Sequence, residues 1–220
     1  MKKLILITVV IIFTAISSCS ENDNEQPFSE STLTQEEIDD LILIGEKEIL
    51  TQQEIDDLIF LREEEKLARD VYLFSFDKYG AAIFGNISKS EQQHMDQVLI
   101  LLNAYQLIDP ASIERGVFTN QTLQNLYNDL IAQSDISLKD ALAVGAAIED
   151  LDINDIEENI DRTVKEDILI VYNNLKCGSR NHLRNYTNQL EIINVNYVPQ
   201  YISLEEFNEI INSNNEKCGR

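Results

Sequence analysis

Apolar residues recur along this chain at alternating intervals of three and four positions, the spacing that places side chains on one face of a helix. One such series covers residues 58–72 and a second covers residues 87–105. A third series covers residues 138–156 and a fourth covers residues 168–190. Four long series, in a chain of 220 residues with only seven glycines and three prolines, predict an all-α protein and argue against a β-sandwich or an alternating α/β fold.

Capping residues and helix breakers set the expected helix ends. Thr51 and Glu54 form a helix-start signal, and Gly80 ends the helix that follows. The residues of segment 152–155 favour caps over helix interiors, so we expect the third long helix to bend or restart there. The predicted helices are 52–79, 86–106, 138–151 and 164–193 in the bundle, 119–133 between the second and third of these, and a short C-terminal helix after Ser203.

The N-terminus has the pattern of a secretion signal. A short positive region is followed by the apolar residues 4–15, a run too short to span a membrane comfortably. The next four residues, Ile16-Ser17-Ser18-Cys19, resemble a bacterial lipobox, which implies cleavage before Cys19 and attachment of diacylglycerol to its sulfur. We therefore expect residues 1–18 to be a lipoprotein signal peptide, and the mature chain to be exported and anchored to a membrane, in the periplasm or on the outer-membrane surface.

Further segments flank the main helical region. Residues 19–32 are polar and aperiodic, as in a flexible tether. Residues 33–50 are expected to form a duplicated helical arm, because the sequence of residues 33–42 recurs almost unchanged at 50–59. Two copies are too few for a solenoid, and a spacer or partner-binding role for the arm stays open. The main domain is then 51–212, followed by an expected disordered tail at 213–220.

The chain is strongly acidic. Its formal net charge of −22 argues against nucleic acid or an anionic membrane surface as a ligand. The same acidity keeps proteins soluble, so it does not by itself establish a field that attracts cations.

The cysteines leave several interpretations open. With Cys19 acylated, Cys177 and Cys218 remain, and an exported compartment permits them to pair. The alternatives are a structural disulfide, two unrelated thiols, or a redox or metal-binding role for Cys177.

Each apolar series is interrupted by carboxylates or by a histidine, and these residues are the candidates for chemistry. The second series contains Glu91 and His94, three positions apart, so both side chains project to one side of the helix. An unpaired ionisable group is costly to bury, and a shared cation would compensate several of them at once. Glu63 and Glu64 are expected to face solvent instead. The predicted metal ligands are Glu65, Glu91, His94, Glu149, Asp152 and His182.

Four separate stretches of the chain resemble, in order, the signatures of an uncharacterised ferritin-like family, domain of unknown function 2202. The stretches are residues 65–72, 90–95, 148–153 and 178–183, and the resemblance covers about residues 52–207. It implies a ferritin-like four-helix bundle related to rubrerythrins and bacterioferritins. Their di-iron sites take a glutamate from the first helix, Glu-x-x-His from the second, a glutamate from the third and Glu-x-x-His from the fourth. These roles fall on Glu65, Glu91 with His94, Glu149, and His182.

One position departs from that pattern. Ser179 stands where the superfamily has its fourth-helix glutamate, and a neutral hydroxyl is a poor substitute for a bridging carboxylate. Asp152 resembles an extra carboxylate on the third helix of rubrerythrin-like sites and would partly replace it. Otherwise the bundle holds one metal ion or none.

Several polar residues on the same helices are candidates to support the ligands. The imidazole nitrogens not used for ligation need hydrogen-bond partners, for which Asp70, Asn181 and Tyr172 are the candidates. Ser179 is a further candidate to support the ligands, and Tyr72 and Tyr186 would donate hydrogen bonds or electrons, or only pack.

The residues and the resemblance together favour an exported, lipid-anchored protein that binds iron, as one or two ions, with ferroxidase or peroxidase activity. Manganese or zinc is the alternative metal. Two other functions stay open: a non-catalytic module that sequesters or senses metal, and a metal-free structural or interaction lipoprotein. With three cysteines the chain has no rubredoxin-like cysteine quartet to pass electrons. A homo-oligomer is compatible with each function, and nucleic acid is not an expected partner.

Overall fold

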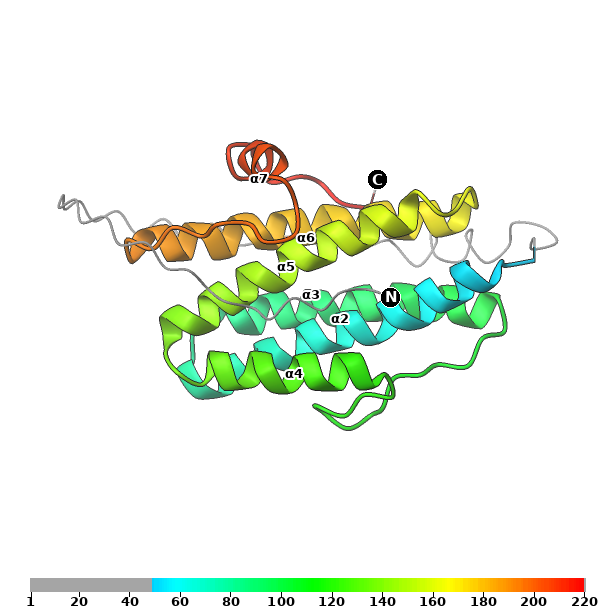
Figure 1. Cartoon of the computed structure of the whole chain (residues 1–220), viewed down its shortest axis with the longest axis horizontal. Helices are drawn as coiled ribbons and strands as arrows, with labels where there is room; N and C mark the ends of the chain where they lie inside the picture. The colour runs from blue at the N-terminus through cyan, green and yellow to red at the C-terminus, as the bar shows by residue number, and fades with distance from the viewer. Residues whose placement is uncertain (1–48, 220) are drawn as a thin grey trace.

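A computed structural model of the chain describes residues 49–219, and this part is all-helical, with six helices and no strand (Figure 1). The expected signal peptide, the expected tether and nearly all of the expected arm, with Cys19, lie outside the described residues. None of the described helices is long and apolar enough to cross a membrane. The helices are α2 (Gln52–Tyr79), α3 (Ala82–Ala104), α4 (Gln121–Ser134), α5 (Leu138–Ile160), α6 (Glu166–Ile192) and α7 (Leu204–Ile211).

The four long helices pack as two pairs. Helices α2 and α3 form one pair and α5 and α6 the other, and the pairs meet where α2 packs on α5 and α3 on α6 (Figure 1). The connection from α3 to α5 is long and contains α4, which packs against both α2 and α5, while α7 lies against α6. The result is a helical bundle with one additional helix on its flank, as the apolar series predicted.

The first helix begins and ends where its capping residues predict. The Glu54 backbone N–H donates to the Thr51 hydroxyl, and the Thr51 backbone N–H donates to the Glu54 carboxylate at 2.7 Å. At the other end Gly80 takes φ 67°, a left-handed conformation that a glycine adopts without steric cost.

Two predicted helix boundaries were wrong. Helix α3 begins at Ala82 and not at 86–90, because the chain reverses within residues 80–81 and Phe84 in the first turn is fully buried. Helix α5 runs without a break through 152–155, because Asp152 and Ile153 are buried against the bundle. Tertiary packing has therefore overridden the local preference of these residues for caps.

The expectation that Glu63 and Glu64 face solvent was also wrong, since both side chains are buried. The Glu63 carboxylate accepts hydrogen bonds from the backbone N–H groups of Thr119 and Asn120, at 2.6 and 2.8 Å. It thereby fixes the segment that leads into α4. The connection between α3 and α5 covers this face of α2. The periodicity of α2 alone does not indicate that this face is buried.

The C-terminal residues 213–219 do not form the expected disordered tail. Cys177 and Cys218 form a disulfide, and the Cys218 side chain is buried. Glu216 pairs with Arg180 and Arg184 of α6. Of the alternatives for the two cysteines, the structure therefore contains the disulfide, and it ties the tail to α6.

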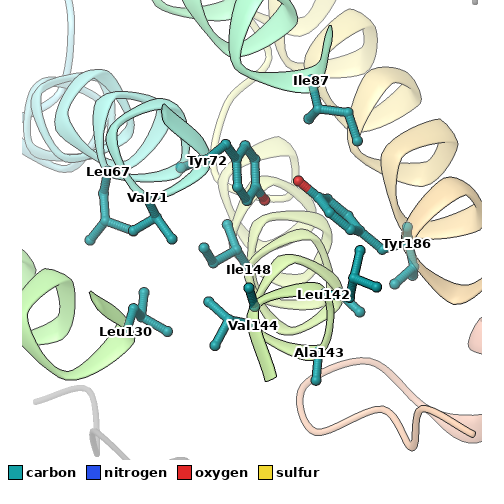
Figure 2. Packing of buried hydrophobic residues seen from close by; sticks show 14 of the residues in the cluster. Leu67, Val71, Tyr72, Ile87, Leu130, Leu142, Ala143, Val144, Ile148 and Tyr186 are labelled. Atoms are coloured by element: carbon teal, nitrogen blue, oxygen red, sulfur yellow. The ribbon is translucent and has the colours of Figure 1, made fainter. Parts of the chain in front are cut away.

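The core consists of two apolar clusters at opposite ends of the bundle. The first cluster fills the end near α4 (Figure 2), where Tyr186 packs directly over Gly145. A Cβ at Gly145 would lie 2.4 Å from the Tyr186 ring, so only glycine leaves room for this contact. Main members of the first cluster are Leu67, Tyr72, Ile87, Leu142, Leu183 and Tyr186, and of the second cluster Leu58, Leu61, Val98, Leu101, Ile168 and Leu175.

Replacing Cys177 and Cys218 together by Ser should lower the free energy of unfolding by about 2–4 kcal/mol, because the disulfide constrains the unfolded chain over a separation of 41 residues. Denaturant titration of both proteins, with and without reductant, measures the loss. The double variant is its own control, since reductant should not alter its midpoint. A wild-type midpoint that is unchanged by full reduction would show that the disulfide does not stabilise the fold.

Candidate metal centre

Between the two apolar clusters, each long helix contributes ionisable side chains to the centre of the bundle. On α2, Glu65 follows Leu61 of the second cluster and precedes Tyr72 of the first. On the other three long helices the ionisable residues likewise lie between residues of the two clusters. The clusters come in the opposite order on helices that run in the opposite direction. The layer between the clusters is formed by Glu65 of α2, Glu91 and His94 of α3, Glu149 of α5 and His182 of α6, all buried.

These side chains form two overlapping triads. Glu65, Glu91 and His94 make the first, and Glu91, Glu149 and His182 make the second. Within each triad, one potential ligand atom from every residue lies within 4.8 Å of the others. Four helices that are far apart in sequence therefore converge on one small volume.

Glu91 belongs to both triads and lies between the two histidines. One of its carboxylate oxygens, Oε2, lies 2.8 Å from Nδ1 of His94, and the other, Oε1, lies 2.8 Å from Nδ1 of His182. The outer glutamates complete the arrangement: Glu65 is 3.2 Å from His94 Nδ1 and Glu149 is 3.4 Å from His182 Nδ1. The two imidazole rings stack with centroids 5.5 Å apart. The site is thus built as two similar halves around one carboxylate.

Burial and mutual repulsion perturb the acids of this layer. Burial raises the pKa of Glu65 to about 8, with a contribution from nearby Glu91 that His94 offsets in part. Burial, aided by Glu91, likewise raises the pKa of Glu149 to about 7. Burial also acts to raise the pKa of Glu91, but His182 and His94 outweigh it and lower that pKa to about 2. The central carboxylate is therefore held ionised, whereas the histidines compensate the outer two only in part.

The residues fit a transition-metal ion. Each triad offers one imidazole nitrogen and carboxylate oxygens, a donor set that suits iron and manganese and is also found with zinc. The Glu65 Oε1 atom is buried and accepts no hydrogen bond from any residue in 49–219. Leaving such an atom without a partner is costly, and a cation would supply one.

Asp152 lies beside the triads but belongs to neither. It is buried one helical turn after Glu149, and neither of its oxygens accepts a hydrogen bond from the described part of the chain. Burial and the negative charge of Glu64, followed by that of Glu65, raise its pKa well above the ordinary value. The sequence predicted Asp152 as a ligand, whereas in the structure it faces a pocket that it shares with Glu64.

Three predicted supporting residues lie close to the site or on its helices. The Tyr72 hydroxyl donates to Oε1 of Glu149 at 2.5 Å, and the Tyr186 hydroxyl points toward that of Tyr72 (Figure 2). The Ser179 hydroxyl instead donates to the Leu175 carbonyl of its own helix, at 3.2 Å. The Ser179 proton is therefore used within α6.

The three candidates to orient the imidazoles have other partners. Asp70 forms buried ion pairs with Lys66 and Arg69. The Asn181 side chain accepts a hydrogen bond from Arg184 and donates one to the tail. The charged groups that act on Tyr172 are chiefly Asp57 and Glu54 in the first turns of α2, and Arg162 just after α5.

Sequence reasoning missed Glu64. Three consecutive glutamates, 63–65, follow one another on α2, and only Glu65 continues the apolar series. Only the packing of α4 against this face of α2 would have identified Glu64. That packing is a long-range contact, which the local sequence does not indicate.

Comparison with known proteins agrees with this fold. Residues 54–214 match the family described as uncharacterised protein domain DUF2202. The uncharacterised protein MJ0754 of Methanocaldococcus jannaschii is 51% identical over 153 residues, which make up 69% of this chain and 83% of that protein. The crystal structure of hypothetical protein MJ0754 from Methanococcus jannaschii superimposes with a TM-score of 0.77 at 50% identity, covering 78% of this chain and 99% of that one.

Replacing Glu65 by Gln should flatten the pH dependence of stability in metal-free protein. The carboxyl has a pKa of 4.5 as a free side chain and about 8 in the fold, so between these values the folded state keeps a proton that the unfolded state has lost. The free energy of unfolding of the wild type should therefore fall as the pH rises through this window, and less so in the variant.

Urea titrations in chelator, at about pH 5 and about pH 8, measure the two slopes. The exposed Glu191→Gln serves as the control and should follow the wild type. Parallel curves for Glu65→Gln and the wild type would contradict the assignment of this proton to Glu65.

Proposed function

The chain belongs to the uncharacterised protein domain family DUF2202, and from the site it carries we propose that it is a ferritin-like protein that binds transition metal, preferably iron, in its bundle core. The position of Glu91 is the observation that carries this proposal. One carboxylate whose two oxygens each face a histidine, with a further glutamate beside each histidine, is the arrangement expected of a ligand shared by two metal ions.

The topology supports the ferritin-like assignment. Two pairs of long helices are joined by one long connection, and every long helix contributes at least one acid or imidazole to the central layer. The absence of a glutamate at Ser179 leaves Glu91 as the one shared carboxylate among the described residues. Fewer protein ligands would leave positions open for a small molecule.

Iron suits the site better than zinc, because each half offers a single imidazole and otherwise carboxylates. Iron when bound would supply one-electron chemistry with oxygen or peroxide, which corresponds to ferroxidase or peroxidase activity. The protein would hold the ions through the triads, and Tyr72 would orient Glu149 through its short hydrogen bond. The surrounding apolar clusters would exclude bulk water from the centre.

Metal-free protein reconstituted with Co²⁺ or Fe²⁺ should bind two equivalents per chain by elemental analysis. His94→Ala and His182→Ala should each lose about one equivalent, because each removes the imidazole of one triad, and Glu91→Gln should lose both. Glu191→Gln is the control for a lost surface charge, and thermal melts in chelator confirm that each variant is folded. A wild-type chain that retains no metal after reconstitution would refute the proposal.

Stopped-flow mixing of the iron-loaded protein with oxygen distinguishes an enzyme from a protein that only sequesters metal. Oxidation of Fe²⁺ with repeated turnover, lost in Glu91→Gln, is the expected result. Stable binding of Fe²⁺ without oxidation would assign the protein to metal sequestration or sensing instead.

We also propose that the chain is exported and anchored through a lipid on Cys19. The Cys177–Cys218 disulfide supports export, because disulfides form and persist chiefly outside the cytoplasm. In a bacterial host, the wild type should label with palmitate and fractionate with membranes, whereas Cys19→Ser should lose both properties. Equal labelling of the two proteins would contradict the anchor.

A further inference from the structure

A pocket on the flank of the bundle is lined in part by residues that neighbour the metal centre along α2 and α5. Its walls are mainly apolar side chains from α2, α4 and α5. Two carboxylates, those of Glu64 and Asp152, also line it, and both residues are buried, at 3% and 1% exposure. An acid that has no partner inside an apolar pocket is costly unless it meets a positively charged species.

Two residues that line the pocket are close in sequence to a ligand of one of the triads. Glu64 precedes Glu65 directly on α2, and Asp152 follows Glu149 by one turn of α5. Both Asp152 oxygens are buried and accept no hydrogen bond from the residues in 49–219. The charges that act on Asp152 most strongly are all carboxylates, led by Glu64 and Glu65. A cation is the species that this side chain would bind.

The outer end of the pocket is formed by Tyr201 and Leu151, the lining residues that are only half-buried near the C-terminal segment. Asp150 fixes this segment: its carboxylate accepts hydrogen bonds from the Tyr197 hydroxyl and from the backbone N–H groups of residues 200–202, at 2.6 to 3.2 Å. Tyr201 is therefore held in place at the mouth by α5 itself.

We propose that Glu64 and Asp152 form a transit site for a divalent cation, through which the metal passes from the pocket mouth at Tyr201 to the two triads. This inference rests on the proposed metal-binding function. Two carboxylates without an imidazole bind a divalent cation more weakly than a full ligand set, which suits a site that must release the ion inward. Carboxylates in an apolar pocket also concentrate cations and accelerate their capture.

The test compares the rate of metal uptake with the amount bound at equilibrium. Metal-free wild type, Asp152→Asn, Glu64→Gln and the double variant are mixed with Co²⁺ in a stopped-flow spectrometer, and bound cobalt is then counted by elemental analysis. Each single variant should take up cobalt at least about tenfold more slowly, yet reach the same two equivalents. Asp129→Asn is the matched control, because Asp129 is exposed on α4 outside the pocket, and it should load like the wild type.

The outcomes are distinguishable. Equal uptake rates for the wild type and Asp152→Asn, with two equivalents bound, would overturn the transit site and leave the metal centre intact. Loss of an equivalent at equilibrium in Asp152→Asn would make Asp152 a ligand of the centre and would also overturn it. A wild type that binds no cobalt or iron would overturn both proposals. Asn is nearly the same size as Asp, and thermal melts verify that the variant is folded.

Discussion

The structure depends on one electrostatic constraint, a layer of acids and imidazoles buried between two apolar clusters. The clusters hold the bundle together, because each of them contains residues of all four long helices. The layer opposes that stability, since its acids are buried and Glu65, Glu149 and Asp152 each lie near other acids. A fold that keeps such a layer needs protons or cations inside it. Binding of a cation would therefore stabilise the fold as well as serve any chemistry.

Glu91 organises the layer because it is the acid closest to both imidazoles. The two histidines hold it ionised, while Glu65 and Glu149 keep raised pKa values. Three ionised glutamates would bring three negative charges to the triads, and two divalent cations would bring four positive ones. The single excess positive charge would be balanced by Asp152, which lies just outside. This balance gives Asp152 an electrostatic role even though it joins neither triad.

Periodicity predicted the features that depend on one helix at a time. Glu65 was placed inward because it continues the apolar series of α2, and the full extent of α2 followed from Thr51 and Gly80. Features that depend on contacts between distant segments were not predictable in this way. Glu64 is buried because a later helix covers it, and Cys218 is ordered because it reaches Cys177, a pairing that three cysteines alone do not specify.

Asp152 was not placed correctly by helical periodicity. Residues three apart on a helix differ in direction by about 60°, so both belong to one face only if that face is broad enough. Glu91 and His94 share this offset and still converge, because their partners approach from α2 and α6. On α5 the same offset leaves Asp152 outside both triads, where it lines the pocket together with residues of α4. A buried acid beside a metal centre that is not one of its ligands is well placed to receive an ion that arrives from outside.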